Sequence, residues 1–223
     1  MDYSVIQENR DLRAQSRSQL KGVWGKMALA ILVYYLITMV PQFLFWEYGF
    51  LHIPLLETII TIAVFVVMGP FALGLVGYFL KRIRQEEFCL NNIFDGFLKF
   101  LPSFLLMFFY MLFIFLWTLL LIVPGLIKMY AYSMVFYIMY DNPEIKPLDA
   151  IKQSKIMMKG YKGKLFLLHL SFIGWGFLCI LTLGIGFLWL MPYMMLAEGN
   201  FYENLKKNQE KPAAGSSSGE GQE

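Results

Sequence analysis

Residues that could carry acid–base, nucleophilic or metal chemistry are few in this chain and do not cluster. It has two histidines and two cysteines, Cys89 and Cys179. No H-E-x-x-H, G-x-S-x-G or G-x-x-x-x-G-K-S/T pattern occurs, so no known metal, nucleophile or phosphate-loop motif is present. We therefore predict no catalytic residues, no metal site and no cofactor, and we expect that the protein is not an enzyme.

Three ionisable side chains, those of Lys128, His169 and Glu198, fall inside apolar stretches. Such groups are unfavourable at membrane depth and usually have a function there. A contact between His169 and Glu198 allows two interpretations, a hydrogen-bonded pair between neighbouring helices or a proton relay. Lys128 is expected near the outer membrane surface, where its flexible stem lets the ammonium group reach the lipid headgroups.

Two prolines, Pro70 and Pro192, lie inside apolar stretches that we expect to be helical. A proline at such a position removes a backbone N–H donor and kinks the helix. Broken helices in corresponding positions are one feature of transport sites, but they are also common in ordinary membrane bundles. Both interpretations stay open. Small residues in the same stretches predict close helix packing, namely Gly74, Gly77, Ser171 and Gly174.

The apolar residues form long blocks. The 223-residue chain is 58% hydrophobic and 16% charged, against roughly 25% charged residues in water-soluble domains. Residues 27–80, 100–140 and 165–202 form three apolar tracts, each too long for one membrane crossing of about 20 residues. Turn-forming residues interrupt each tract near its middle, as in "VPGL" and "LTLGIG". We predict an all-α polytopic membrane protein with six transmembrane helices arranged as three hairpins.

The basic residues indicate how the chain is threaded. Of the 19 lysines and arginines, all but Lys128 lie outside the three tracts, at their boundaries. Because cytoplasmic loops are enriched in lysine and arginine, we place every tract boundary and both termini in the cytoplasm, beneath a plasma membrane. Residues 1–26 are then a cytoplasmic N-terminal segment, 27–205 the membrane domain, and 206–223 a disordered cytoplasmic tail rich in Gly, Ser and Glu.

Two short segments are predicted to form amphipathic helices on the cytoplasmic surface. Residues 147–159 begin with proline and precede a glycine, which suits a helix. Lys152, Lys155 and Lys159 would lie within about 60° of one another on this helix, opposite apolar side chains. They are candidate contacts for anionic lipid headgroups, each contributing on the order of 1 kcal/mol. Residues 86–100, "EEFCLNNIFDGFLKF", repeat their apolar side chains at helical spacing and predict a second interfacial helix.

Two functions of different class remain open. In the first, the protein has no enzymatic activity and engages membrane lipids or a partner protein through its helices and the lysine-bearing segment. In the second, it is a small-solute or lipid transporter or exporter that depends on Pro70, Pro192 and Glu198. A homo-oligomer is compatible with both functions, and nucleic acid is not expected among the partners.

Several stretches carry a resemblance to known proteins: "SRSQLKGVWGKMALAILV", "IFDGFLKF", a long stretch from "VPGLIKMYAYSMVF" to "LHLSFIGWGFL", and "LTLGIGFLWLMPYMMLAEGNFYENL". In these stretches the chain resembles the domain-of-unknown-function family 975 of bacterial integral membrane proteins. The resemblance covers nearly the whole chain except the tail. It implies a bacterial plasma membrane, of Gram-positive type, and it carries over no activity and no catalytic residues.

Overall fold

The computed structural model describes residues 7–41 and 54–210, and every regular element within these ranges is helical. In chain order the elements are α1 (Asn9–Leu20), α2 (Trp24–Thr38), α4 (Pro54–Ile83), the 3-10 helix η2 (Leu90–Lys99), α5 (Phe100–Leu120), α6 (Ile122–Ala131), α7 (Val135–Asp141), α8 (Pro147–Met157), α9 (Lys162–Leu170), α10 (Ile173–Leu181) and α11 (Phe187–Glu210). The all-α class predicted from the sequence is therefore confirmed.

The described ranges contain four segments that are long and apolar enough to cross a membrane: Thr58–Ile83, Leu90–Leu120, Ile122–Asp141 and Lys162–Leu181. Helices α1 and α2 pass the same test together, but they are bent by 97° at their junction. Alone, the 15 residues of α2 extend about 22 Å, less than the roughly 30 Å of a bilayer core. Helix α11 carries several charged residues and does not qualify. The predicted arrangement of six spans in three hairpins is not confirmed.

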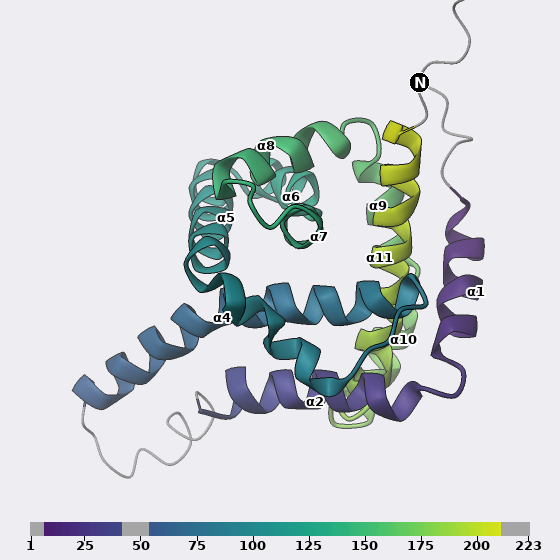
Figure 1. The fold of residues 1–223 in the computed structure, drawn as a ribbon, viewed down its shortest axis with the longest axis horizontal. Helices are drawn as coiled ribbons and strands as arrows, with labels where there is room; N and C mark the ends of the chain where they lie inside the picture. The colour runs from purple at the N-terminus through teal and green to yellow at the C-terminus, as the bar shows by residue number, and fades with distance from the viewer. Residues whose placement is uncertain (1–6, 42–53, 211–223) are drawn as a thin grey trace, which may run out of the picture.

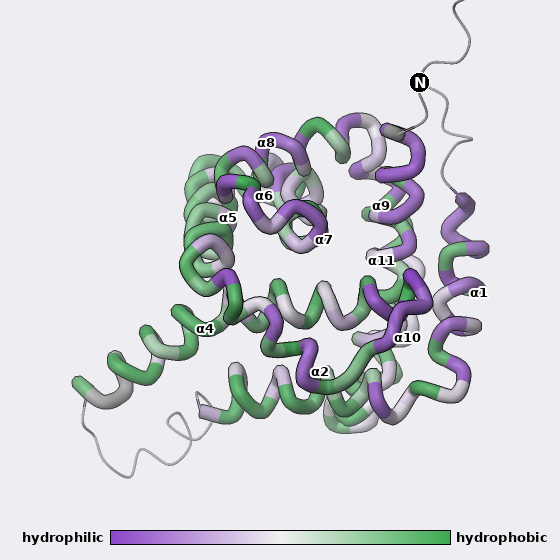
Figure 2. The backbone as a smooth tube through the Cα atoms, viewed as in Figure 1, coloured by the Kyte–Doolittle hydropathy of each residue, from purple (hydrophilic) through white to green (hydrophobic). Residues whose placement is uncertain are grey.

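Helices that are neighbours in the sequence pack against each other: α2 contacts α4, α5 contacts α6, and α10 contacts α11. Figure 1 shows that these pairs do not share one axis. Helices α2 and α4 run across the view, α11 runs along the right-hand side, and α5 is seen obliquely on the left. Hydrophobic residues cover much of α4 and α5, whereas hydrophilic residues gather on α1 and α8 (Figure 2).

Two predicted turns lie at or beside the breaks in the structure. The turn of the third hairpin runs from Thr182 to Gly186, where Leu183 and Gly184 have φ angles of 54° and 85°. The turn of the second hairpin lies at Leu121, slightly before the predicted "VPGL". Pro124 is accepted in the first turn of α6, because the N–H groups of a first turn have no partner within the helix.

The apolar segment Ile122–Asp141 is broken between α6 and α7, and the sequence patterns did not predict this break. Ser154 of α8 fills it: its hydroxyl group donates a hydrogen bond to the Ala131 carbonyl at 3.0 Å and accepts one from the Met134 N–H at 3.2 Å. Both backbone groups would otherwise lack partners in an apolar setting. The side chain of Ser154 thus holds α8 against the bundle.

Helix α8 was predicted to lie with its apolar side on the membrane surface, but these side chains face protein. Ala150, Ile151, Met157 and Met158 are buried in the main hydrophobic core, where α8 packs on α5 and α7. Its lysines are exposed. The segment before α5 is also helical, but as the 3-10 helix η2, whose threefold repeat places Ile93 and Gly96 on one buried side.

Helix α4 changes direction within its length (Figure 1), and Pro70 lies inside it, just as Pro192 lies inside α11. The backbone of η2 approaches α4 closely beyond Pro70. A Cβ atom on Gly74 would overlap the carbonyl oxygen of Ile93, and one on Gly96 would overlap the carbonyl oxygen of Pro70. Both positions therefore require glycine.

The predicted tail begins inside a helix. Helix α11 continues through Lys206 and Lys207 to Glu210, because Lys206 reaches a carboxylate on α7. The rest of the predicted tail and most of the predicted first turn lie outside the described residues.

Candidate functional site

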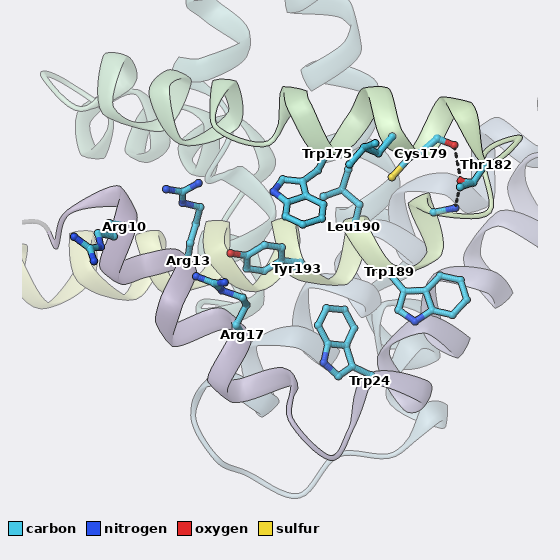
Figure 3. Close-up of a pocket in the computed structure, with 12 residues that line it drawn as sticks. Arg10, Arg13, Arg17, Trp24, Trp175, Cys179, Thr182, Trp189, Leu190 and Tyr193 are labelled. Carbon is cyan, nitrogen blue, oxygen red and sulfur yellow. Dashed lines mark hydrogen bonds between the residues drawn. The ribbon is translucent and has the colours of Figure 1, made fainter.

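A pocket of about 670 Å³ lies between α1, α10 and α11, with Trp24 of α2 at its edge. Its lining residues are Arg10, Arg13, Arg17, Trp24, Trp175, Leu178, Cys179, Thr182, Gly186, Trp189, Leu190 and Tyr193. Figure 3 shows an uneven distribution of polarity. The arginines project from α1 at one end, and Leu190, Cys179 and Thr182 lie toward the other end. The pocket therefore has a cationic end and an apolar end.

The cationic end is built by helical spacing. At 100° per residue, Arg10, Arg13 and Arg17 fall within about 60° of one another on α1. No carboxylate of the described residues lies within 4.0 Å of these guanidinium groups, by the ion pairs that the structure shows. The hydroxyl group of Tyr193 points toward the arginines (Figure 3). This end of the pocket offers hydrogen-bond donors and positive charge to an anion.

Helix α1 is held in place by hydrogen bonds to α11 and α4. Asn200 donates to Ser16 at 3.1 Å and to Gln19 at 2.8 Å, and Gln19 donates back to Asn200 at 3.1 Å. Arg82 donates two hydrogen bonds, of 2.8 and 2.6 Å, to the Gln19 carbonyl near the C-terminus of α1. Leu12 and Leu20 are buried on the same side. These contacts fix the direction in which the arginines project.

The apolar end of the pocket contains a threonine, but its polar atoms are already used. The Thr182 hydroxyl group donates to the Cys179 carbonyl at 2.9 Å and accepts from the Gly186 N–H at 3.0 Å (Figure 3). Cys179 and Leu190 are buried, whereas the Trp175 and Trp189 side chains are partly exposed at the rim. A ligand at this end meets mainly apolar atoms and indole rings.

The structure brings His169 and Glu198 together, as one sequence interpretation allowed. His169 Nε2 on α9 lies 4.0 Å from Glu198 Oε1 on α11. Tyr130 of α6, which the sequence analysis did not single out, adds its hydroxyl group 3.4 Å from His169 Nδ1. Tyr110 and Tyr137 are close enough to feel the charge of Glu198. The contacts of this polar cluster connect α6, α9 and α11.

Lys128 is placed differently from the expectation. Its ammonium group lies over the Trp117 ring, 4.1 Å from the ring centroid, in a cation–π contact between α6 and α5. It also lies within electrostatic range of Lys155 and Lys162. Because Ser154 draws α8 against α6, the structure does not separate Lys128 from the lysines of α8 and α9. In the described part of the chain, the side chains found in contact with His169 are those of Glu198 and Tyr130, not that of Lys128.

Lys152, Lys155 and Lys159 are exposed on one side of α8 and its C-terminal turn. Lys152 is paired with Asp149 at 3.2 Å. No pocket adjoins these lysines among those that the structure shows in its described part.

A buried carboxylate joins the ends of three helices. Asp141 of α7 accepts hydrogen bonds from Arg84 at 2.7 and 2.9 Å, from Lys206 at 2.6 Å and from Tyr202 at 2.9 Å. Arg84 also donates to Glu203 at 2.8 Å. Burial by itself would lower the pKa of Arg84, but the hydrogen bonds that Arg84 donates to Asp141 and Glu203 outweigh burial and raise that pKa. The cluster is a structural fastening between α4, α7 and α11.

From the sequence, the arginines of α1 indicated only the cytoplasmic side of the membrane and were not predicted to belong to a binding site. Their spacing of i, i+3 and i+7 could have shown that the three arginines share one side of a helix. Nothing in the local sequence indicated that this side would lie beside α10 and α11. Among the described residues, no three His, Cys, Asp or Glu side chains are grouped so that they could hold a metal ion.

Comparison with known proteins identifies the family. A family model described as "Protein of unknown function (DUF975)" matches residues 1–131 and 118–209, so the chain belongs to this family, as its sequence indicated. No curated protein matches the chain, and no solved structure matches it.

Proposed function

We propose that this DUF975 protein binds an anionic lipid in the pocket between α1, α10 and α11. The observation that carries the proposal is the polarity of the pocket, with three arginines at one end and buried apolar side chains at the other. An amphiphile has the same division, a charged head and an apolar chain. The arginines attract the charged head, and the apolar end of the pocket accepts the chain.

The proposal includes the setting of the pocket. We place the protein in a bacterial plasma membrane with both termini in the cytoplasm, as the basic residues predict. One ion-pair cluster joins Arg84, Asp141 and Glu203. Each of these residues lies at the end of a predicted crossing, which supports placing the three ends on the same side of the membrane. The arginines of α1 would then lie at the inner headgroups, with the pocket leading toward the bilayer core.

The test compares two triple variants that remove the same number of charges. Arg10→Gln/Arg13→Gln/Arg17→Gln changes the pocket, and Lys152→Gln/Lys155→Gln/Lys159→Gln changes the exposed side of α8. Native mass spectrometry of protein from nanodiscs containing phosphatidylglycerol would measure the bound lipid. We expect the arginine variant to lose it and the lysine variant to keep it. Loss in the lysine variant alone would refute the pocket and favour the surface of α8.

Transport is a second candidate function, favoured by the contact of His169, Glu198 and Tyr130 inside the helical assembly. Flux of lipid or solute in proteoliposomes that is abolished by Glu198→Gln, with lipid binding preserved, would support it. Lipid binding without flux would leave a binding protein. We retain the expectation that the protein is not an enzyme.

A further inference from the structure

We infer that the lipid in this pocket carries a phosphomonoester head group, as phosphatidate does, rather than a phosphodiester. This inference rests on the proposed function and specifies the chemical class of its ligand. It follows from the number of cations at the head-group end, from the donors they present and from the apolar character of the other end.

The charge at the arginine end is high and is not neutralised locally. Asp11 is turned by about 100° from Arg10 around α1, and Glu8, which precedes the helix, would be turned by about 160°. A phosphodiester head has one negative charge for three guanidinium groups. Arg13 is half-buried and Arg10 and Arg17 are exposed, so solvent screens part of their mutual repulsion, and one negative charge leaves the remainder uncompensated. A phosphomonoester carries a charge of about −1.5 to −2 at pH 7 and compensates more of this repulsion.

The donors also fit a terminal phosphate. Each guanidinium group presents N–H donors in a planar fork that matches two oxygens of one phosphate. A phosphomonoester has three oxygens free to accept, whereas a phosphodiester has two. Arg13 and Arg17 flank the direction in which the Tyr193 hydroxyl group points (Figure 3), so a third donor faces the same place.

The opposite end accepts a chain and offers little to a second polar group. Thr182 has its hydroxyl group engaged with Cys179 and Gly186, so it presents its methyl group to the pocket. Leu190, which also lines the pocket, is buried. Inorganic phosphate would use the arginines but leave this end empty, so we commit to a lipid-borne phosphate.

The chain supplies a probe of occupancy at the apolar end. Cys179 lines the pocket, and the other cysteine of the chain, Cys89, is exposed and does not line it. Cys89→Ser leaves Cys179 as the sole thiol and keeps a good N-cap for η2. The alkylation rate of Cys179 by a small membrane-permeant maleimide would then report whether a chain occupies the pocket.

The experiment uses the delipidated full chain with Cys89→Ser and titrates dioleoyl phosphatidate, dioleoyl phosphatidylglycerol and inorganic phosphate separately. We expect half-protection of Cys179 at a concentration of phosphatidate about tenfold or more below that of phosphatidylglycerol, and no protection by inorganic phosphate. At about pH 5, below the second phosphate pKa of about 6, the preference should shrink, because phosphatidate then loses its second charge while the arginines keep theirs.

The outcomes separate this inference from the proposed function. Equal protection by both lipids overturns the phosphomonoester class and leaves a lipid pocket. Protection by neither lipid overturns both proposals, and protection by inorganic phosphate overturns the requirement for a chain. Arg17→Lys, which keeps the charge and removes the fork, should lower the preference for phosphatidate, with circular dichroism showing that the helices remain. An unchanged preference in Arg17→Lys would contradict the role given to the guanidinium fork.

Discussion

Replacing Asp141 by asparagine should destabilise the protein, because this one carboxylate fastens α7 to α4 and α11. The wild-type side chain accepts hydrogen bonds from Arg84, Lys206 and Tyr202. Asparagine keeps the shape but loses the charge, and its NH₂ group donates on one side where the carboxylate accepts. Two cations would then face a neutral group in a largely buried position.

The magnitude follows from burial and from the partners that remain. Breaking a buried ion pair by removing one partner costs about 3–5 kcal/mol. The Asp141 side chain is only 6% exposed, but Arg84 and Lys206 are 26% and 37% exposed, so solvent screens part of the loss. Arg84 also keeps Glu203. We therefore expect the free energy of unfolding to fall by about 2–3 kcal/mol.

The assay is unfolding of the purified protein in mixed micelles by increasing SDS, followed by circular dichroism. Glu144→Gln is the matched control, since it also neutralises a carboxylate that pairs with a cation, here Lys99. The Glu144 side chain is 90% exposed, and loss of such a surface pair should change the unfolding free energy far less than Asp141→Asn does. If Asp141→Asn and Glu144→Gln had the same effect, the buried cluster would not hold the helices together, and the reasoning would be wrong.

Three further predictions concern packing and threading. Gly74→Ala should lower the unfolding free energy by about 1–3 kcal/mol, because the new Cβ atom overlaps the backbone of η2. In the control Gly174→Ala the new Cβ atom has no neighbour within 4 Å, so this variant should be neutral or more stable by up to about 1 kcal/mol. Equal effects of the two variants in SDS unfolding would contradict the close approach of η2 to α4. Ser154→Ala leaves the Ala131 carbonyl and the Met134 N–H without this partner, and should lower the unfolding free energy by about 1 kcal/mol in the same assay. No change would mean that these two backbone groups find other hydrogen-bond partners. A membrane-impermeant amine reagent on intact cells should leave Lys155 and Lys207 unmodified, and labelling of either, detected by mass spectrometry, would refute the cytoplasmic placement.

Local patterns were sufficient for the helices and several of their ends. The glycine-rich "LTLGIG" marked the turn that separates α10 from α11, and the spacing of Ala150, Ile151 and Met157 identified the side of α8 that is buried. These features depend on residues within a few positions of one another, so periodicity and turn chemistry reveal them. The same reasoning failed at the break after Ala131, because the group that stabilises it belongs to another helix.

In the candidate site, too, local sequence predicted some features and tertiary contacts decided the others. The sequence provided the three arginines on one side of α1, and it suggested the contact of His169 with Glu198 because both fell in the third apolar tract. It did not reveal the pocket, whose walls come from opposite ends of the chain. Asn200, which holds α1 against α11, is 184 positions from its partner Ser16.

By itself, the sequence determined that this protein is helical, apolar over long tracts and segregated in charge, because each of these properties is a sum over neighbouring residues. The tertiary structure decided which charges meet. It buried Asp141 among cations, placed Lys128 on Trp117 and set the arginines of α1 beside an apolar cavity. These contacts depend on how the helices cross and on which side chains and backbone groups need hydrogen-bond partners once water is removed. No local sequence pattern encodes such long-range contacts.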